Sequence, residues 1–503
     1  MTPDSEATHN GGGMGDPELA GILSKVARRY PPPQLPALPL SEPPATVLAA
    51  VIEQARRALA EGRRPSTSMK QRFLDALAAL IRAAMQPENG DPAIQAMVLR
   101  HHDAVVREYA SLHAHAHSDR RRVRTLVNAI AHPARLRRER QTAASTGTGA
   151  EPEAGTGILA ALYDHARAEA WEALASAGRA MLVDAAPPAL GGASNQGATG
   201  AEAAPSSPLN NRLAHLLNST ALRRLRRLDA LAAHDAVCRY RTLRDQMGPR
   251  ARSDAASAGG SASHRRGAAV EAAAARALEA LARRLNAAED GGGPRYRVVT
   301  SMRAPATLPA HHSHAKTEWD AVLLRQAEDG TWEIGLLVEA KASVDAAATD
   351  LPRLLRGLRL LAQADENAVY TFQTREGAVA LRGASLRRLP GSDADLAAAV
   401  LYCSNAPEQP APRLLSAASR MQLLSAPASL AFASTLDADA HRETGQGPET
   451  PAHRETAGRL EPVWRDLLAS QRWHAVLNQY STLCTALGLM VHVRDLEAAA
   501  HRP

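Results

Sequence analysis

The chain has 503 residues, long enough for several domains that each bury a core, and alanine and arginine dominate a composition with only 3% aromatic residues. Its formal net charge of +7 suits a polyanionic partner without identifying one, because arginine also coats ordinary solvated helix faces. Cys238, Cys403 and Cys484 form no CxxC pair, which argues against a disulfide framework or a structural zinc site and fits a reducing, cytoplasmic compartment.

The N-terminal part is expected to alternate helical regions with linkers. Residues 1–43 contain glycine and proline clusters and no apolar signal segment, which predicts a disordered leader. Apolar residues at three-to-four spacing predict a helical domain over 44–141, followed by a Gly/Thr/Ala-rich linker at 142–155. A further helix is expected at 156–185, before a second linker at 186–208. No run approaches the roughly 18 apolar residues of a membrane span, so no membrane contact is expected.

Residues 209–250 are predicted to form one long basic amphipathic helix. Its apolar stripe and the arginines that flank it are Leu222, Leu225, Leu228 and Leu231, with Arg223, Arg224, Arg226 and Arg227. Such a stripe is typical of a helix that packs on a neighbour and keeps its arginines in water. A helix that contacts nucleic acid is the alternative, because clustered arginines also attract phosphates.

Predicted helices and strands alternate only in the second half of the chain. Residues 264–405 are expected to fold as one α/β domain. The predicted elements are a helix at 265–287, strands at 295–302, 317–325 and 332–341, a helix at 350–364, strands at 367–373 and 377–382, and a helix–strand pair through 395–404. A helical extension over 406–434, a polar linker over 435–457 and a mostly helical C-terminal segment over 458–503 complete the chain.

Lysine is rare in this chain, and one lysine closes an apolar strand. Of 59 lysines and arginines, four are lysines, which leaves 55 arginines. The pKa of lysine shifts readily on burial whereas arginine stays charged, so Lys341 hints at a function that arginine cannot perform. Side chains two residues apart share one face of a strand, so Glu339 and Lys341 point together.

Two further carboxylates are candidates to join this pair. If the runs 317–325 and 332–341 form an antiparallel hairpin, Asp320 lies near Glu339 at the same end. Two carboxylates there make an oxygen-ligand site suited to Mg²⁺ or Mn²⁺, beside an ammonium that can act on water or phosphate. Glu271 borders the apolar face of the preceding helix, a position that allows it to lean toward the same cluster.

These residues resemble a known pattern. Glu271 on a helix, Asp320 on a strand and Glu339-x-Lys341 on the next strand are similar to the PD-(D/E)xK phosphodiesterase superfamily, the restriction-endonuclease-like fold. The resemblance covers residues 264–405 and implies a central mixed sheet flanked by helices.

The resemblance also implies roles for the individual residues. Asp320 and Glu339 would bind the divalent metal, Lys341 would position or activate the attacking water, and Glu271 would assist. Trp319 stands where the proline of the PD-(D/E)xK motif would be. This is a departure from the motif at a position that varies within the superfamily.

The helix after Lys341 is a further candidate for phosphate contact. Such helices often face phosphates in these enzymes, and here the polar candidates are Arg353, Arg356 and Gln363. The same three side chains are equally compatible with a solvated helix face.

The favoured function is that of a metal-dependent nuclease that uses one or two Mg²⁺ ions, with DNA preferred to RNA as substrate. The absence of a Walker A loop, of GxGxxG after a strand and of a nucleophile elbow argues against NTP-driven, dinucleotide-dependent and serine-hydrolase chemistry. Two alternatives stay open: a helical interaction or scaffold protein with a catalytically silent module, and a metal-free basic protein that binds nucleic acid. The helical regions would supply phosphate attraction or contact a protein partner.

Overall fold

The computed structural model describes ten stretches of the chain, which form two compact units. The described residues are 16–35, 42–132 with 134, 153–184, 208–248, 254–288, 295–309, 314–390, 396–408, 413–440 and 458–502. The first unit consists of Met1–Arg82, Pro249–Ser429 and Gly447–Pro503, and the second of Ala83–Gly248 and Leu430–Gln446. This division cuts the range 44–141, expected as one helical domain, at Arg82.

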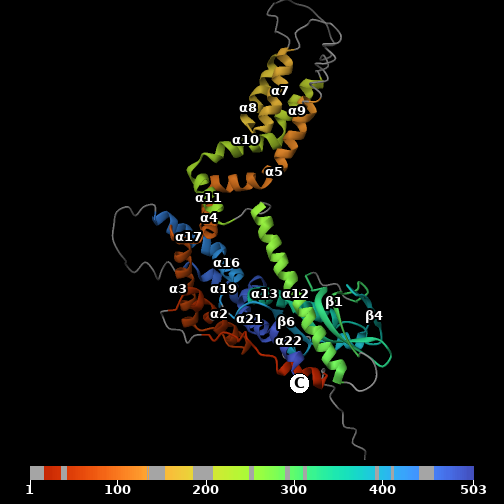
Figure 1. The fold of residues 1–503 in the computed structure, drawn as a ribbon. Helices are drawn as coiled ribbons and strands as arrows, with labels where there is room; N and C mark the ends of the chain where they lie inside the picture. Colours follow the sequence, from red (N-terminus) through yellow and green to blue (C-terminus); the bar gives the residue numbers. More distant parts are fainter. Residues whose placement is uncertain are drawn as a thin grey trace, which may run out of the picture. The chain divides into compact units, whose positions relative to one another are not determined.

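The first unit contains a seven-stranded mixed sheet, so the mixed α/β class is confirmed. Its strands are β1 (Tyr296–Arg303), β2 (Glu318–Gln326), β3 (Trp332–Ala340), β4 (Val369–Thr374), β5 (Gly377–Arg382), β6 (Val400–Ser404) and β7 (Met490–His492). The order across the sheet is β2-β1-β4-β5-β3-β6-β7, with β2 also paired to β3. Figure 1 shows the sheet beside α12. The six strands expected before residue 405 are all present.

The extra pairing closes five of the strands into a ring. β1, β2 and β3 form an antiparallel meander with extended registers, whereas β1 meets β4 only at Arg303–Gln373 and β3 meets β5 only at Trp332–Leu381. The sheet is therefore partly closed into a ring. An open central sheet between helices was expected, so the closure differs from the prediction. Beyond the ring, β6 runs parallel to β3.

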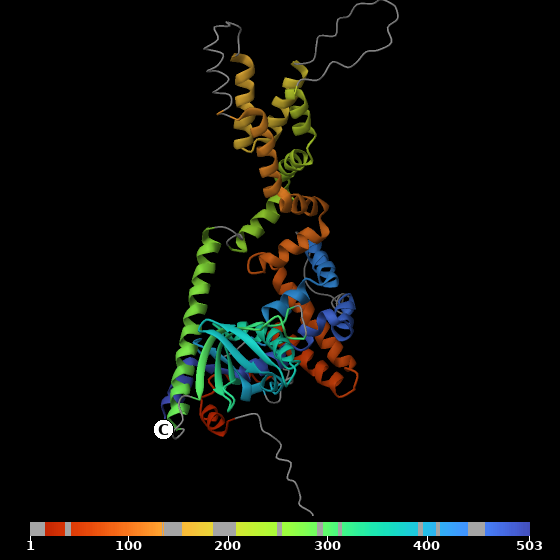
Figure 2. The same ribbon diagram turned by 90° about the vertical axis from the view of Figure 1, so that its right-hand side faces the viewer.

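Helices cover the two faces of this sheet. α12 (Asp254–Ala288) runs along one face (Figure 2), where its Ala274 and Leu278 pack with Val338 of β3. α13 (Val344–Leu361) covers the other face, where Leu354 packs with Leu337. Adjacent β3 residues thus face opposite cores, as a strand dictates. Glu339 follows Val338 and belongs to the α13 face.

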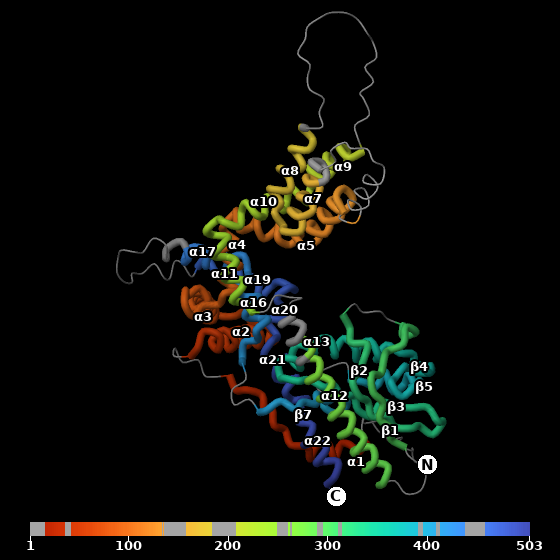
Figure 3. Tube along the Cα trace, turned by 45° about the horizontal axis from the view of Figure 1, so that its top comes forward, coloured from red at the N-terminus to blue at the C-terminus, as the bar shows by residue number. Residues whose placement is uncertain are grey.

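Both chain ends contribute to the first unit. α1 (Pro17–Ser24) begins at Asp16, whose carboxylate caps the helix, and it buries Leu19, Ile22 and Leu23. Residues 16–35 are therefore an ordered part of the expected disordered leader, because their apolar residues recur at helical spacing and enter the core of α12. α22 (Val493–His501) lies beside α12 and α1 (Figure 3), and β7 pairs with β6. The α/β domain expected over 264–405 is therefore completed by elements from outside this range: α1, β7 and α22.

The remaining elements described in the first unit are helical. They are α2 (Pro44–Ala60), α14 (Gly383–Arg387), α15 (Leu396–Ala399), α16 (Ala417–Leu424), α19 (Glu461–Ala469), a 3-10 turn at Gln471–Trp473, α20 (His474–Leu477) and α21 (Gln479–Leu489). α3 (Thr67–Met85) and α17 (Pro427–Ala440) each extend across a boundary between the units. None of the helices in the described ranges combines the length and the apolar character that a membrane crossing requires.

The second unit is a bundle of helices. Its helices are α4 (Pro92–His102), α5 (Ala104–Ala131), α7 (Glu153–Arg167), α8 (Trp171–Asp184), α9 (Pro208–Asn218), α10 (Thr220–Ala232) and α11 (Asp235–Gln246). The expected helix 156–185 is two helices, α7 and α8, because Glu169 adopts a positive φ of 58° between them. Glu169 forms ion pairs with Arg120 and Arg124 of α5, which fix the turn between α7 and α8.

The expected single helix 209–250 is three helices, α9 to α11. Ser219 ends the first and caps the second, since its hydroxyl accepts the Leu222 N–H at 3.2 Å. The leucine stripe is buried as predicted. Three of the four arginines form ion pairs between helices, at 2.7, 2.5 and 2.7 Å: Arg224 with Asp119, Arg226 with Glu172 and Arg227 with Glu108. The expected linkers at 142–155, 186–208 and 435–457 lie largely outside the described residues.

Candidate functional site

The strand register brings the predicted acidic residues together. β2 and β3 pair antiparallel with Ala321 opposite Val338, which places Asp320 opposite Glu339. The Ala340 N–H donates a hydrogen bond of 2.8 Å to Asp320 Oδ2. The antiparallel hairpin expected from the sequence is confirmed, and it places both carboxylates at the end of β3.

The Glu339 carboxylate is fully buried, and Lys341 reaches it. The Lys341 Nζ lies 3.3 Å from Glu339 Oε2, and its side chain retains 17% exposure against 0% for Glu339. The Lys341 N–H donates to the Cys403 carbonyl of β6 at 2.9 Å, which fixes the backbone just beyond the strand. Asp320, Glu339 and Lys341 therefore lie together at the C-terminal end of β3, where the Lys341 side chain remains partly exposed.

Two residues that the sequence did not single out complete the cluster. Lys316 Nζ lies 2.6 Å from Glu339 Oε2, with only 7% of its side chain exposed. Asp350 of α13 lies 3.4 Å from Lys341 Nζ and 4.0 Å from Lys316 Nζ. The Tyr402 hydroxyl of β6 donates to Asp350 Oδ2 at 3.3 Å. Two of the four lysines in the chain thus meet at one carboxylate, so the rarity of lysine was a signal for Lys316 as well.

α13 holds Lys316 in place through its backbone. The Lys316 N–H donates to the Arg353 carbonyl at 3.1 Å. Gly357, one turn further along α13, allows the close approach, because a Cβ there would lie 2.6 Å from the Lys316 carbonyl oxygen. The segment before β2 is therefore fixed against the helix that follows β3.

Burial and like charge shift the pKa values of this cluster. Burial, together with the negative charge of Asp320, raises the pKa of Glu339 to about 8, and the two lysines only partly oppose this. Burial lowers the pKa of Lys341, but Glu339 and Asp350 outweigh it, so the net shift is upward. Burial and the charge of Asp350 raise the pKa of Tyr402. Burial therefore favours the neutral form of Glu339, while the two nearby ammonium groups favour its charged form.

The other predicted site residues do not join the cluster. Glu271 is exposed on α12, which packs on the face of the sheet opposite α13. The Arg356 guanidinium donates to the His314 carbonyl at 3.2 and 3.0 Å, so it holds the loop before β2. Gln363 follows the end of α13, about 20 Å along the helix axis from Asp350. Arg353 is exposed one turn beyond Asp350 and remains a candidate for phosphate contact.

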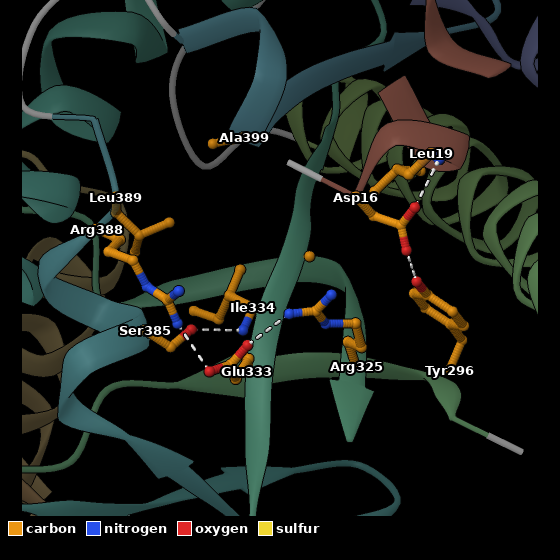
Figure 4. Close-up of a pocket in the computed structure, with 11 residues that line it drawn as sticks. Asp16, Leu19, Tyr296, Arg325, Glu333, Ile334, Ser385, Arg388, Leu389 and Ala399 are labelled. Carbon is orange, nitrogen blue, oxygen red and sulfur yellow. Dashed lines mark hydrogen bonds and ion pairs between the residues drawn. The ribbon is translucent and has the colours of Figure 1, made fainter. Parts of the chain in front are cut away.

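A hollow of about 180 Å³ lies at the other end of β3, away from the cluster (Figure 4). Glu333 lies in it between Arg325 and Arg388, at 3.0 and 2.7 Å. The Asp16 carboxylate accepts the Tyr296 hydroxyl across the same space. Its charged groups are paired with one another, so this hollow offers less chemistry than the cluster at Lys341.

The donor atoms of the cluster limit how a metal ion could be held. Among the described residues, no group of three or more His, Cys, Asp or Glu side chains is placed to share a metal ion. A metal would therefore have two carboxylate ligands, Asp320 and Glu339, and complete its shell with water and phosphate, as Mg²⁺ commonly does. Glu339 Oε1 is buried and has no hydrogen-bond partner within the described ranges, so it is an available ligand.

Comparisons of the chain with protein-family models, with curated proteins and with solved structures gave no match.

Proposed function

We propose that the chain is a Mg²⁺-dependent nuclease that hydrolyses the phosphodiester bonds of nucleic acid. The observation that carries the proposal is the convergence of Asp320, Glu339 and Lys341, which a nuclease centre requires and a chance motif does not. The buried, unpartnered Oε1 of Glu339 is the second support, because an isolated buried carboxylate oxygen is costly unless a cation or donor meets it.

The order of elements along the chain supports the proposed resemblance to restriction-endonuclease-like proteins. The helix–meander–helix–strand sequence from α12 to β6 sets β6 parallel to β3, with α12 and α13 on opposite faces. The β4–β5 hairpin, which closes the ring of five strands, departs from a simple central sheet. This hairpin is inserted in the chain between α13 and β6. It does not separate β3 from its neighbours, because β3 still pairs with both β2 and β6.

Each residue has a separate task in this proposal. Asp320 and Glu339 would hold Mg²⁺, which supplies positive charge to the phosphodiester and makes a water more acidic. The Lys341 ammonium, partly exposed beside Glu339, orients the attacking water and offsets charge that develops on the phosphate. Asp350 holds that ammonium from the other side, at 3.4 Å.

One observation favours a non-catalytic scaffold as the second candidate. The short Lys316–Glu339 pair already compensates the buried charge, as it would in a purely structural ion-pair network. The third candidate, a metal-free nucleic-acid-binding protein, needs a continuous basic face over 209–250. The breaks between α9, α10 and α11 and the pairing of three of their arginines argue against such a face.

A cleavage assay tests the proposal directly. The full chain and its Lys341→Ala variant would be incubated with single- and double-stranded DNA and RNA in Mg²⁺, in Mn²⁺ and in EDTA. We expect metal-dependent cleavage that falls at least about 100-fold in Lys341→Ala, because the positioned ammonium acts on the transition state.

Lys70→Ala is the matched control, since Lys70 is a lysine on α3 whose ion pair with Glu461 lies near the surface. It should cleave at the wild-type rate. Failure of the wild-type chain to cleave any substrate would leave the scaffold candidate ahead.

A further inference from the structure

The cluster contains one more carboxylate than it has ammonium groups. Asp320, Glu339 and Asp350 carry three negative charges when ionised, and Lys316 and Lys341 carry two positive charges, which leaves a net charge of −1. One divalent ion would change this to +1, which matches a single phosphodiester. Two divalent ions would give +3 in a mostly buried site, where excess charge is costly.

The two oxygens of Glu339 have different partners. Both ammonium groups lie on Oε2, with Lys316 at 2.6 Å and Lys341 at 3.3 Å. Oε1 has no hydrogen-bond partner among the described residues. The lysines therefore leave one oxygen of Glu339 for a cation and fill the space around the other.

Lys316 is a fixed cation and not a mobile surface lysine. Its side chain is 7% exposed, and its backbone is held by the Arg353 carbonyl and by the close approach of Gly357. It also lies 4.0 Å from Asp350, so it bridges two carboxylates, as a second metal ion would in a two-metal site.

We propose that the site binds a single divalent ion and that the Lys316 ammonium takes the place of a second one. This inference rests on the proposed function. Lys316 then has a positioning role: it holds Glu339 Oε2 and Asp350, while Asp320 and Glu339 Oε1 receive the ion.

Metal stoichiometry measured without substrate tests the inference. Mn²⁺ would be titrated into the full-length wild-type chain, with free Mn²⁺ followed by electron paramagnetic resonance. We expect one equivalent in the wild type, two in Lys316→Met and one in Lys316→Arg, which keeps the positive charge. Lys70→Met is the matched control and should bind one.

The outcomes separate the two proposals. Two equivalents in a wild-type chain that cleaves nucleic acid would overturn the inference and leave the nuclease proposal standing. No bound Mn²⁺ together with no cleavage would overturn both. Because the wild-type stoichiometry is decisive by itself, the test stands even if Lys316→Met does not fold.

Discussion

At the scale of single residues, Glu339 controls the electrostatics of the site. It is fully buried, faces the negative charge of Asp320, and its pKa is raised to about 8 although two lysines approach it. Burial of a carboxylate favours its neutral form, and a nearby cation favours the charged form. The balance at Glu339 therefore depends on whether a cation is bound.

The raised pKa of Glu339 predicts a pH-dependent stability. Without metal, the folded chain retains this proton at pH values where the unfolded chain, with a pKa near 4.5, has lost it. The stabilising contribution is full below pH 4.5 and is lost as the pH rises through about 8. Relative to Glu339→Gln, the wild type should lose about 1 kcal/mol of unfolding free energy per pH unit between pH 5 and 8.

Thermal unfolding of both proteins in EDTA measures this difference. A constant difference across the range would mean that the lysines already keep Glu339 ionised. Such a result would contradict the raised pKa of Glu339 in the folded chain.

The sequence predicted the centre of the site but not its surroundings. Asp320, Glu339 and Lys341 could be predicted from the sequence, because strand alternation and hairpin pairing depend on local spacing. Lys316 precedes β2 and Asp350 lies on α13, and only the packing of α13 on the sheet brings them to Glu339. Glu271 was misplaced because an apolar helix face shows that a helix packs on a sheet but not on which face.

At the scale of elements, α13 organises the cluster. It contributes Asp350 and, through Gly357, the space into which the Lys316 backbone fits. Its start was expected at residue 350, yet Ser343 caps it from Val344, so it follows Lys341 almost directly. The early start brings Asp350 within reach of the lysines.

Gly357→Ala should destabilise the first unit. The new Cβ would lie 2.6 Å from the Lys316 carbonyl oxygen, and overpacking of this kind costs about 1–3 kcal/mol. Gly267→Ala in α12 is the matched control, because nothing lies within 4 Å of its new Cβ. That change should stabilise the chain by up to about 1 kcal/mol. Equal unfolding midpoints for the two variants would contradict the close approach.

The arginines of α10 serve the helical bundle. Arg224 pairs with Asp119 of α5, whose side chain is 3% exposed. Arg224→Ala would leave that buried carboxylate unpaired and should cost about 1–3 kcal/mol of unfolding free energy. Arg223→Ala, at an exposed neighbouring position, should change the free energy by less than about 0.5 kcal/mol. Chemical denaturation followed by circular dichroism compares them, and equal losses would mean that the Arg224–Asp119 pair adds no stability.

The helical ranges were predictable from periodicity, but their breaks were not. The breaks at Glu169 and at Ser219 depend on tertiary ion pairs and on a capping hydroxyl, neither of which interrupts an apolar pattern. α1 was predictable in principle. Asp16 before Pro17 is a helix start signal, and Leu19, Ile22 and Leu23 have helical spacing.

At the scale of the whole molecule, the first unit is assembled from distant parts of the chain. α1 and α22 complete the core on the α12 side of the sheet, and β7 covers the edge of β6. Without β7, one edge of β6 would be exposed. β6 also contains Cys403, whose carbonyl accepts the Lys341 N–H. A fragment limited to 264–405 would lack these contacts, so the functional tests require the full chain.

The most direct measurement of the central claim is Mg²⁺-dependent cleavage of double-stranded DNA by Asp320→Asn and Glu318→Gln. Asparagine keeps an oxygen that can accept the Ala340 N–H but loses the negative charge that would bind metal. Glu318, two residues earlier on β2, pairs with Arg303 at 3.2 Å near the surface. We expect cleavage to be lost in Asp320→Asn and kept in Glu318→Gln. Equal cleavage by both variants would contradict the metal-binding role of Asp320.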